Sequence, residues 1–217
     1  MRRSVAYRRP GLDPAAWTGP LAVLLVLAGL VATGAGLLRV TGALPLAGGS
    51  RARSLPAGPF PVLAESRPTG IAIPAIHLRA PVHEVGLADD GSITAPPLER
   101  HDQAGWYDGG PTPGEYGPAI IVGHVDTRTG PSVFHDLARL RAGTKVEVTR
   151  RDGRVAVFTV ESVERFDKAA VPADRVYGDF SRPALRLITC GGRWLGGSTG
   201  YADNVVVFAS LTGTRGP

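Results

Sequence analysis

The one cysteine of this 217-residue chain, Cys190, is its strongest candidate for covalent chemistry. Cys190 ends the apolar stretch 185–190 and is followed by Gly191 and Gly192. Glycines after a strand let the backbone turn sharply and let a substrate approach the sulfur. Cysteine is also among the residue types most often buried for packing alone. The apolar segment at residues 20–38, described below, predicts that this part of the chain is exported, and an exported chain with one unpaired thiol needs a reason to keep it, which favours a nucleophile.

A histidine follows a second apolar stretch in the same manner. Residues 119–122 are Ala-Ile-Ile-Val, and Gly123 and His124 come next. A free thiol has a pKa of about 8.5 and is mostly protonated at neutral pH, so a nearby imidazole can stabilise its thiolate or protonate a leaving amine. Taken alone, His124 fits a polar residue at a strand end equally well. Together the two strand ends predict Cys190 as a nucleophile and His124 as its general acid and base.

The elements that would position these residues are short strands. After Thr69, apolar runs rich in β-branched and aromatic residues alternate with Gly, Pro and Asp. The pattern predicts eight strands, near residues 70–73, 76–82, 92–95, 119–122, 145–149, 155–164, 185–190 and 204–211. It predicts one helix from Ser132 to Arg141, which Gly143 would end. Many short strands with one short helix indicate a mostly β barrel or sandwich.

The net positive charge of the chain lies in its N-terminal part. The formal net charge is +5, and residues 1–65 hold seven arginines against Asp13 and Glu65. Residues 66–217 hold 17 basic and 17 acidic side chains, so the predicted domain is neutral. Nucleic-acid binding requires a basic surface on the folded part, and the neutral balance argues against it. One cysteine also excludes an internal disulfide and a cysteine-rich zinc module.

The N-terminal charge flanks an apolar segment. Residues 20–38 carry no charge and match the roughly 20 residues that a helix needs to span a bilayer. Four arginines precede the segment, which predicts a cytoplasmic N-terminus. Its length, and the lack of an A-x-A site, favour a signal anchor over a cleaved signal peptide. We divide the chain into a cytoplasmic basic segment (1–19), a single transmembrane helix (20–38), an extracellular linker rich in proline and glycine (39–68) and an extracellular domain (69–217).

The motifs around the two candidate residues resemble those of the sortases, exported cysteine transpeptidases of Gram-positive bacteria. Ile188-Thr189-Cys190 is similar to the TLxTC strand end of that family, and Gly123-His124 is similar to its histidine position. The resemblance covers residues 69–211 and extends to the class F sortases of actinobacteria. The further motifs that carry it are Gly105-Trp106-Tyr107, Val125-Asp126, Thr129-Gly130-Pro131, Gly191-Gly192 and the run from Tyr201 to Val207.

The resemblance implies an eight-stranded β-barrel with one or two short helices and a thioacyl-transfer reaction without a cofactor. Cys190 would attack the Thr–Gly bond of an LPXTG-like sorting signal at the C-terminus of a secreted protein. His124 would protonate the departing glycine amine. A peptidoglycan precursor or another amine would then take the acyl group from the thioester.

One position departs from the family pattern. Sortases place an arginine on the last strand, where it holds the substrate and stabilises the oxyanion, but the strand here begins Tyr-Ala-Asp-Asn at residues 201–204. Asn204 falls at about the aligned position, and its amide can donate a hydrogen bond to an oxyanion. Arg186 is the other candidate because it lies four residues before Cys190 and so on the same strand face.

Residues beside the thiol are predicted to contact the substrate. These are Thr189, Gly191 and Trp194, the last because the glycine-rich segment that holds it can form a wall of the site. The other four histidines show no HxxxH or HExxH spacing, so no metal site is predicted.

Two other function classes stay open. An L,D-transpeptidase is also an exported cysteine enzyme of the cell wall, but that family carries a histidine two residues before the thiol, where this chain has Ile188. A non-catalytic or divergent cell-surface binding domain on the same fold would fit the missing arginine. The presence of both Cys190 and His124 favours the enzyme.

Overall fold

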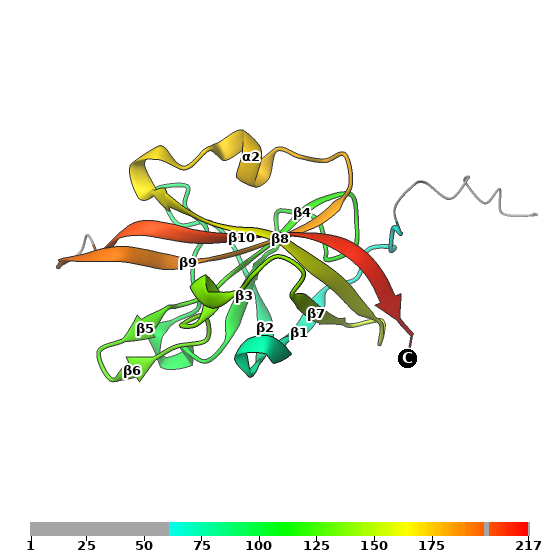
Figure 1. Ribbon diagram of the computed structural model, residues 1–217, viewed down its shortest axis with the longest axis horizontal. Helices are drawn as coiled ribbons and strands as arrows, with labels where there is room; N and C mark the ends of the chain where they lie inside the picture. Colours follow the sequence, from blue (N-terminus) through cyan, green and yellow to red (C-terminus); the bar gives the residue numbers. More distant parts are fainter. Residues whose placement is uncertain (1–60, 198–199, 217) are drawn as a thin grey trace, which may run out of the picture. The chain divides into compact units, whose positions relative to one another are not determined.

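Eight strands of the computed structural model close into a barrel, which confirms the predicted mostly β fold (Figure 1). The structure describes residues 61–197 and 200–216. Around the barrel the strands follow the order β1-β2-β3-β4-β9-β10-β8-β7. The β2–β3 and β4–β9 pairs are parallel and the other pairs within this order are antiparallel. The strands are β1 (Pro68–Ile73), β2 (Leu78–Val85), β3 (Ala104–Tyr107), β4 (Gly117–Val122), β7 (Lys145–Arg150), β8 (Val155–Asp167), β9 (Pro183–Gly196) and β10 (Gly200–Arg215).

Short elements fill the connections between these strands. A two-stranded hairpin of β5 (Asp126–Thr127) and β6 (Gly130–Pro131) follows β4. One α-helix, α2 (Ala173–Tyr177), lies between β8 and β9 within the described residues. The 3-10 turns are η2 (Pro74–Ile76), η3 (Leu98–Arg100), η4 (Leu137–Arg139) and η5 (Lys168–Ala170).

Strand alternation divides the apolar side chains between two clusters. On β9, Leu185 and Leu187 point into the barrel core, whereas Ile188 belongs to a second cluster on the outer face. That outer cluster also holds Val122 of β4 and Phe208 of β10, and Val176 of α2 packs onto it. In Figure 1 the connection that carries α2 runs along one side of the barrel. The outer face of β4, β9 and β10 is therefore covered at one end.

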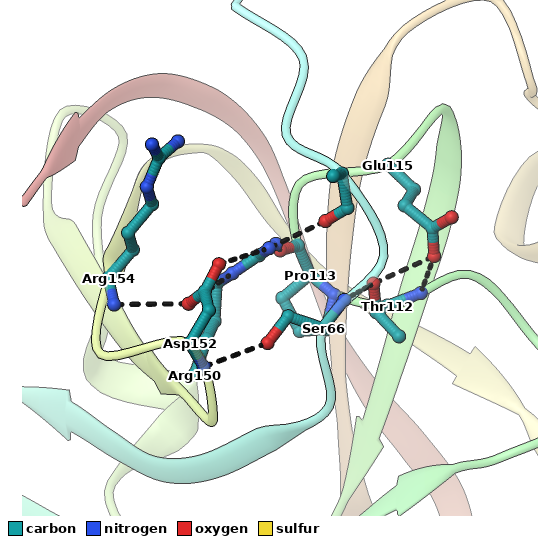
Figure 2. A network of polar contacts seen from close by, with 8 residues as sticks. Ser66, Thr112, Pro113, Glu115, Arg150, Asp152 and Arg154 are labelled. Carbon is teal, nitrogen blue, oxygen red and sulfur yellow. Dashed lines mark hydrogen bonds and ion pairs between the residues drawn. The ribbon is translucent and has the colours of Figure 1, made fainter.

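A buried arginine joins three segments on the barrel (Figure 2). The Arg150 side chain is fully buried and donates to the carbonyl oxygens of Ala64, at 2.6 Å, and Pro113. It also pairs with the Asp152 carboxylate at 3.0 Å. The hydrogen bond from Arg150 outweighs the effect of burial and lowers the pKa of Asp152.

The segment before β1 lies against the barrel. The Leu63 amide donates to the Gly114 carbonyl at 2.9 Å, and its side chain is buried in the core. The Ser66 amide donates to the Thr112 hydroxyl oxygen at 3.0 Å. Residues 61–68, the end of the segment predicted as a linker, are thus part of the folded unit.

Two predicted elements differ from the structure. Residues 92–95 do not form a barrel strand, because only an isolated bridge joins Ile93 to Leu87; the strand at this place in the barrel is β3. The helix predicted from Ser132 to Arg141 is reduced to turns and η4. Near its start the amides bond to distant carbonyls, since Phe134 N–H donates to the carbonyl of His124, and the later amides make only local turn bonds such as Leu137 N–H to the Phe134 carbonyl.

No helix within residues 61–197 and 200–216 is long and apolar enough to cross a membrane. The predicted cytoplasmic segment (1–19) and transmembrane helix (20–38), and the linker up to residue 60, lie outside the described residues.

Candidate active site

Cys190 lies on the outer face of the barrel where β9 loses one of its two neighbours. The last pair between β4 and β9 joins Val122 to Ile188, while β9 itself continues to Gly196 alongside β10. The strand predicted to end at Cys190 therefore continues past it, whereas its neighbour β4 ends at Val122, opposite Ile188. Cys190 is left half-buried, with Asn204 of β10 directly opposite.

Two hydrogen bonds tie the end of β4 to β9 beside the thiol. The Gly123 amide donates to the Ile188 carbonyl at 3.1 Å, and the Thr189 hydroxyl donates to the Gly123 carbonyl at 2.8 Å. Thr189 is buried. These bonds fix the backbone that leads into His124 against the backbone that carries Cys190.

His124 is held from two further sides. Its Nε2 lies 2.6 Å from the Pro96 carbonyl oxygen. A carbonyl oxygen only accepts, so Nε2 carries the hydrogen of this bond and Nδ1 is the nitrogen left for other partners. The His124 carbonyl accepts from the Phe134 amide at 2.9 Å. Both the ring and the backbone of this histidine are thus positioned by long-range contacts.

One cavity of about 890 Å³ is lined by Cys190, His124 and Asn204 together. Its floor is the outer face of β4 and β9, including Ile120 and Ile188. The connection between β2 and β3 lines it with Leu87, residues 90–93 and Ala95, and the segment after β8 lines it with Lys168, Tyr177 and Phe180. The cavity is apolar along β4 and polar at the end that holds the thiol.

The two candidates for the role of the missing arginine lie in different places. Asn204 lines the cavity and is the β10 residue opposite the thiol. Arg186 is buried, does not line the cavity, and stacks on the Phe208 ring with its guanidinium carbon 4.6 Å from the ring centroid. Burial lowers the pKa of Arg186. The structure brings Asn204, and not Arg186, to the thiol.

The residues predicted to contact substrate have contacts within the protein. The Thr189 hydroxyl is used in the bond to Gly123, although the residue lines the cavity. A Cβ at Gly191 would lie 2.8 Å from Val205 Cγ2, so its glycine fits the packing of β9 on β10. Trp194 is 59% exposed, lies on β9 beyond the cavity, and packs edge-on against Tyr201 at 5.0 Å between ring centroids.

A tyrosine and an aspartate meet near the thiol. The Tyr201 hydroxyl donates to the Asp126 carboxylate, which joins β10 to the β5–β6 hairpin. This hydrogen bond is the main cause of a raised Tyr201 pKa, with smaller contributions from burial, from the charge of Asp126 and from the nearby Cys190. Sequence analysis did not single out Tyr201, because nothing in its spacing points to Asp126.

The remaining histidines lie away from Cys190. His77, His101 and His135 line a separate cavity of about 370 Å³, in which the His101 Nδ1 lies 3.2 Å from the Ser132 hydroxyl. His83 is exposed on β2. Within residues 61–197 and 200–216, no group of three or more His, Cys, Asp and Glu side chains is arranged to hold a metal ion.

The chain was compared with protein families, with curated proteins and with solved structures. A family model described as a sortase domain matches residues 71–212. No curated protein matches the chain. Three solved structures are similar. Sortase C2 of group B Streptococcus pilus island 1 has a TM-score of 0.51 at 18% identity over 66% of this chain and 73% of that chain. Sortase A from Corynebacterium diphtheriae has a TM-score of 0.53 at 17% identity, over 69% of this chain and 63% of that chain. Sortase C-1 from Streptococcus pneumoniae has a TM-score of 0.52 at 21% identity, over 70% of this chain and 70% of that chain.

Proposed function

The chain belongs to the sortase family, a family of cysteine transpeptidases, and we propose that it cleaves an LPXTG-like sorting signal between Thr and Gly and transfers the acyl group to a cell-wall amine. The observation that carries this proposal is the cavity that Cys190, His124 and Asn204 share. A nucleophile, a proton carrier and a hydrogen-bond donor at one end of an apolar groove are the parts that acyl transfer needs.

The first half-reaction forms the acyl-enzyme. The Cys190 thiolate attacks the threonine carbonyl carbon, and the charge that develops on the carbonyl oxygen is met by the side-chain amide of Asn204. The C–N bond then breaks, and protonated His124 gives its proton to the departing glycine amine. Nδ1 is the ring nitrogen assigned to this proton, because Nε2 donates to Pro96.

The second half-reaction restores the enzyme. An acceptor amine attacks the thioester carbonyl, and neutral His124 takes a proton from the amine. The C–S bond breaks, an amide forms, and Cys190 leaves as the thiolate. Splitting the exchange into two acyl transfers keeps the acyl group activated until the amine arrives.

The shape of the cavity suits a peptide with an apolar start. Leu87, Ile120 and Phe180 line it away from the thiol, and Phe180 is largely exposed. The leucine and proline of a sorting signal would bury apolar surface here, at about 25 cal/mol per Å². The threonine carbonyl would then lie at the Cys190 end.

The class and the location of the enzyme belong to the same proposal. The motifs quoted from residues 105–107, 123–126 and 201–207 support a class F-like sortase. The arginines before residues 20–38 support a single-pass anchor with the N-terminus in the cytoplasm and the barrel outside the cell. Its protein substrates would be secreted proteins with a C-terminal sorting signal.

The test is capture of the acyl-enzyme. The full chain, in detergent, is incubated with an LPXTG peptide with and without an amine, and intact-protein mass spectrometry follows the mass of the chain. We expect an acyl adduct on the wild type that the amine removes, none on Cys190→Ala, and a strongly slowed reaction in His124→Ala. A folded wild type whose thiol is alkylated freely but forms no adduct with several sorting peptides would favour a binding domain.

A further inference from the structure

Lys168 is the only lysine or arginine among the described residues that line the cavity with Cys190. It begins η5 directly after β8, and its side chain is exposed. No ion pair or hydrogen bond engages its ammonium within residues 61–197 and 200–216. A cation that lines a substrate groove without an internal partner is available to a charged group of the substrate.

Strand register places Lys168 at the thiol end of the groove. Cys190 lies opposite Asn204, and Asn204 lies opposite Phe166 of β8. Adjacent strands are about 4.8 Å apart, so Phe166 is roughly 10 Å across the barrel surface from Cys190. Lys168 follows two residues later, directly after the end of β8 that is nearer to Cys190, and carries its ammonium on a four-carbon stem.

One carboxylate lines the opposite wall. Asp90 accepts from the Ser92 amide at 2.9 Å and from the Ser92 hydroxyl at 2.7 Å. The hydroxyl bond in particular lowers the pKa of Asp90, so this wall stays negative. The cavity is therefore lined by Lys168 on the β8 side and by the hydrogen-bonded carboxylate of Asp90 on the side of the β2–β3 connection. His124 is the other titratable group near the thiol end, and its Nε2 is occupied by Pro96.

From this arrangement we infer that Lys168 selects sorting signals with an acidic side chain at the variable position, next to the scissile threonine. The inference rests on the proposed function and narrows its substrate class. With the threonine carbonyl at Cys190 and the leucine on the apolar part of the cavity, the variable residue lies close to the thiol end, where Lys168 reaches. A lysine there attracts an acidic side chain and repels a basic one.

The experiment compares three peptides that differ only at the variable position, with Glu, Gln or Lys between Pro and Thr. The kcat/KM of peptide cleavage is measured for the wild type, Lys168→Met, Lys168→Glu and Lys145→Met. Lys145 is the matched control because it is the other lysine of the chain, is exposed, and donates to Thr159 rather than lining the cavity. Binding of the same peptides to Cys190→Ala, with and without each Lys168 change, is measured in parallel.

We expect the wild type to favour the Glu peptide over the Gln peptide by about fivefold, the upper range for an exposed ion pair. Lys168→Met should remove this preference, Lys168→Glu should reverse it toward the Lys peptide, and Lys145→Met should leave it unchanged. The preference should also weaken as salt is raised.

Two results would overturn the inference. One is an unchanged Glu-to-Lys ratio in Lys168→Glu. The other is an equal loss of kcat on all three peptides in Lys168→Met, which would place the ammonium at the reacting carbonyl instead of the variable side chain. If no peptide acylates Cys190, the proposed reaction fails, and the binding series on Cys190→Ala still decides whether Lys168 selects acidic peptides.

Discussion

Replacement of Thr189 by valine tests whether the hydrogen bond between β9 and the end of β4 positions the proposed catalytic residues Cys190 and His124. The Thr189 hydroxyl is buried and donates to the Gly123 carbonyl at 2.8 Å, one residue from His124 and one from Cys190. Valine keeps the shape but has no donor, which leaves the buried carbonyl with an unmade hydrogen bond. An unsatisfied buried acceptor costs about 1–3 kcal/mol.

The cost converts into two measurable changes. For a domain of this size, 1 kcal/mol shifts the melting temperature by roughly 2–4 °C, so a loss of about 2 kcal/mol lowers it by about 4–8 °C. A shift of about 1 Å in a reacting group can slow catalysis about a hundredfold, so a partial loosening of His124 should slow acylation at least about tenfold.

The assay pairs thermal unfolding with the rate of acyl-enzyme formation, and Thr189→Ser is the matched control because it keeps the hydroxyl. Serine should retain most of the acylation rate even where the lost methyl lowers stability. A Thr189→Val protein that melts and acylates like the wild type would refute the positioning argument. Equal slowing in valine and serine would assign the effect to packing at position 189 rather than to the hydrogen bond.

Two further predictions concern packing and charge. Gly123→Ala puts a Cβ 2.6 Å from Val133 Cγ1, so we expect about 1–3 kcal/mol of destabilisation and slowed acylation, whereas Gly213→Ala, with open space around it, should change neither melting nor rate. Arg150→Met removes the donor to two carbonyls and should cost about 3 kcal/mol in urea unfolding. Because Arg150 lowers the pKa of Asp152, that carboxylate stabilises the fold above its unfolded pKa of about 3.9, and this contribution is lost as pH falls further. Arg150→Met should therefore lose less stability between about pH 4 and pH 2 than the wild type, and an equally steep loss would contradict this role of Arg150.

Most barrel strands could be predicted because their side chains follow a simple pattern. The predicted strands 145–149 and 155–164 alternate or run apolar at strand length, and both lie within strands of the structure, Lys145–Arg150 and Val155–Asp167. The strand Ala104–Tyr107 was missed because it is four residues long and contains Gly105. That glycine is explained only by the fold, since a Cβ there would lie 2.7 Å from Val85 Cγ1.

The helix predicted from Ser132 to Arg141 does not form because hydrogen bonds to distant segments replace the helical bonds that its apolar spacing predicts. Val133, Phe134 and Leu137 have helical spacing, and Phe134 and Leu137 are fully buried. The amide of Val133 nevertheless donates to the His101 carbonyl, and that of Phe134 to the His124 carbonyl. These partners lie 32 and 10 residues earlier in the chain, so no local window reveals them.

The meeting of Cys190 and His124 at one cavity could be predicted for a related reason. Cys190 and His124 each follow an apolar run, and such runs pair when they are neighbouring strands of one sheet. Lys168 and Tyr201 carry no such signal, because their relation to the thiol depends on the register of β8 and β9 on β10. A residue that lies near the thiol because it is on a neighbouring strand can be identified only once the pairing of the strands is known.

The difference in length between β4 and β9 explains why Cys190, and no earlier residue of β9, lies beside an uncovered strand edge. Up to Ile188 the strand has a partner on each side, and its outer face is covered by apolar packing. Beyond Ile188, β4 has ended at Val122, and the chain turns away through Gly123 to place His124 beside the uncovered edge. The continuing pair of β9 and β10 holds Cys190 opposite Asn204, and both residues line the cavity. A longer β4 would cover the thiol, and a shorter β9 would leave it on a loop, so the unequal strand lengths give a thiol that is both fixed and accessible.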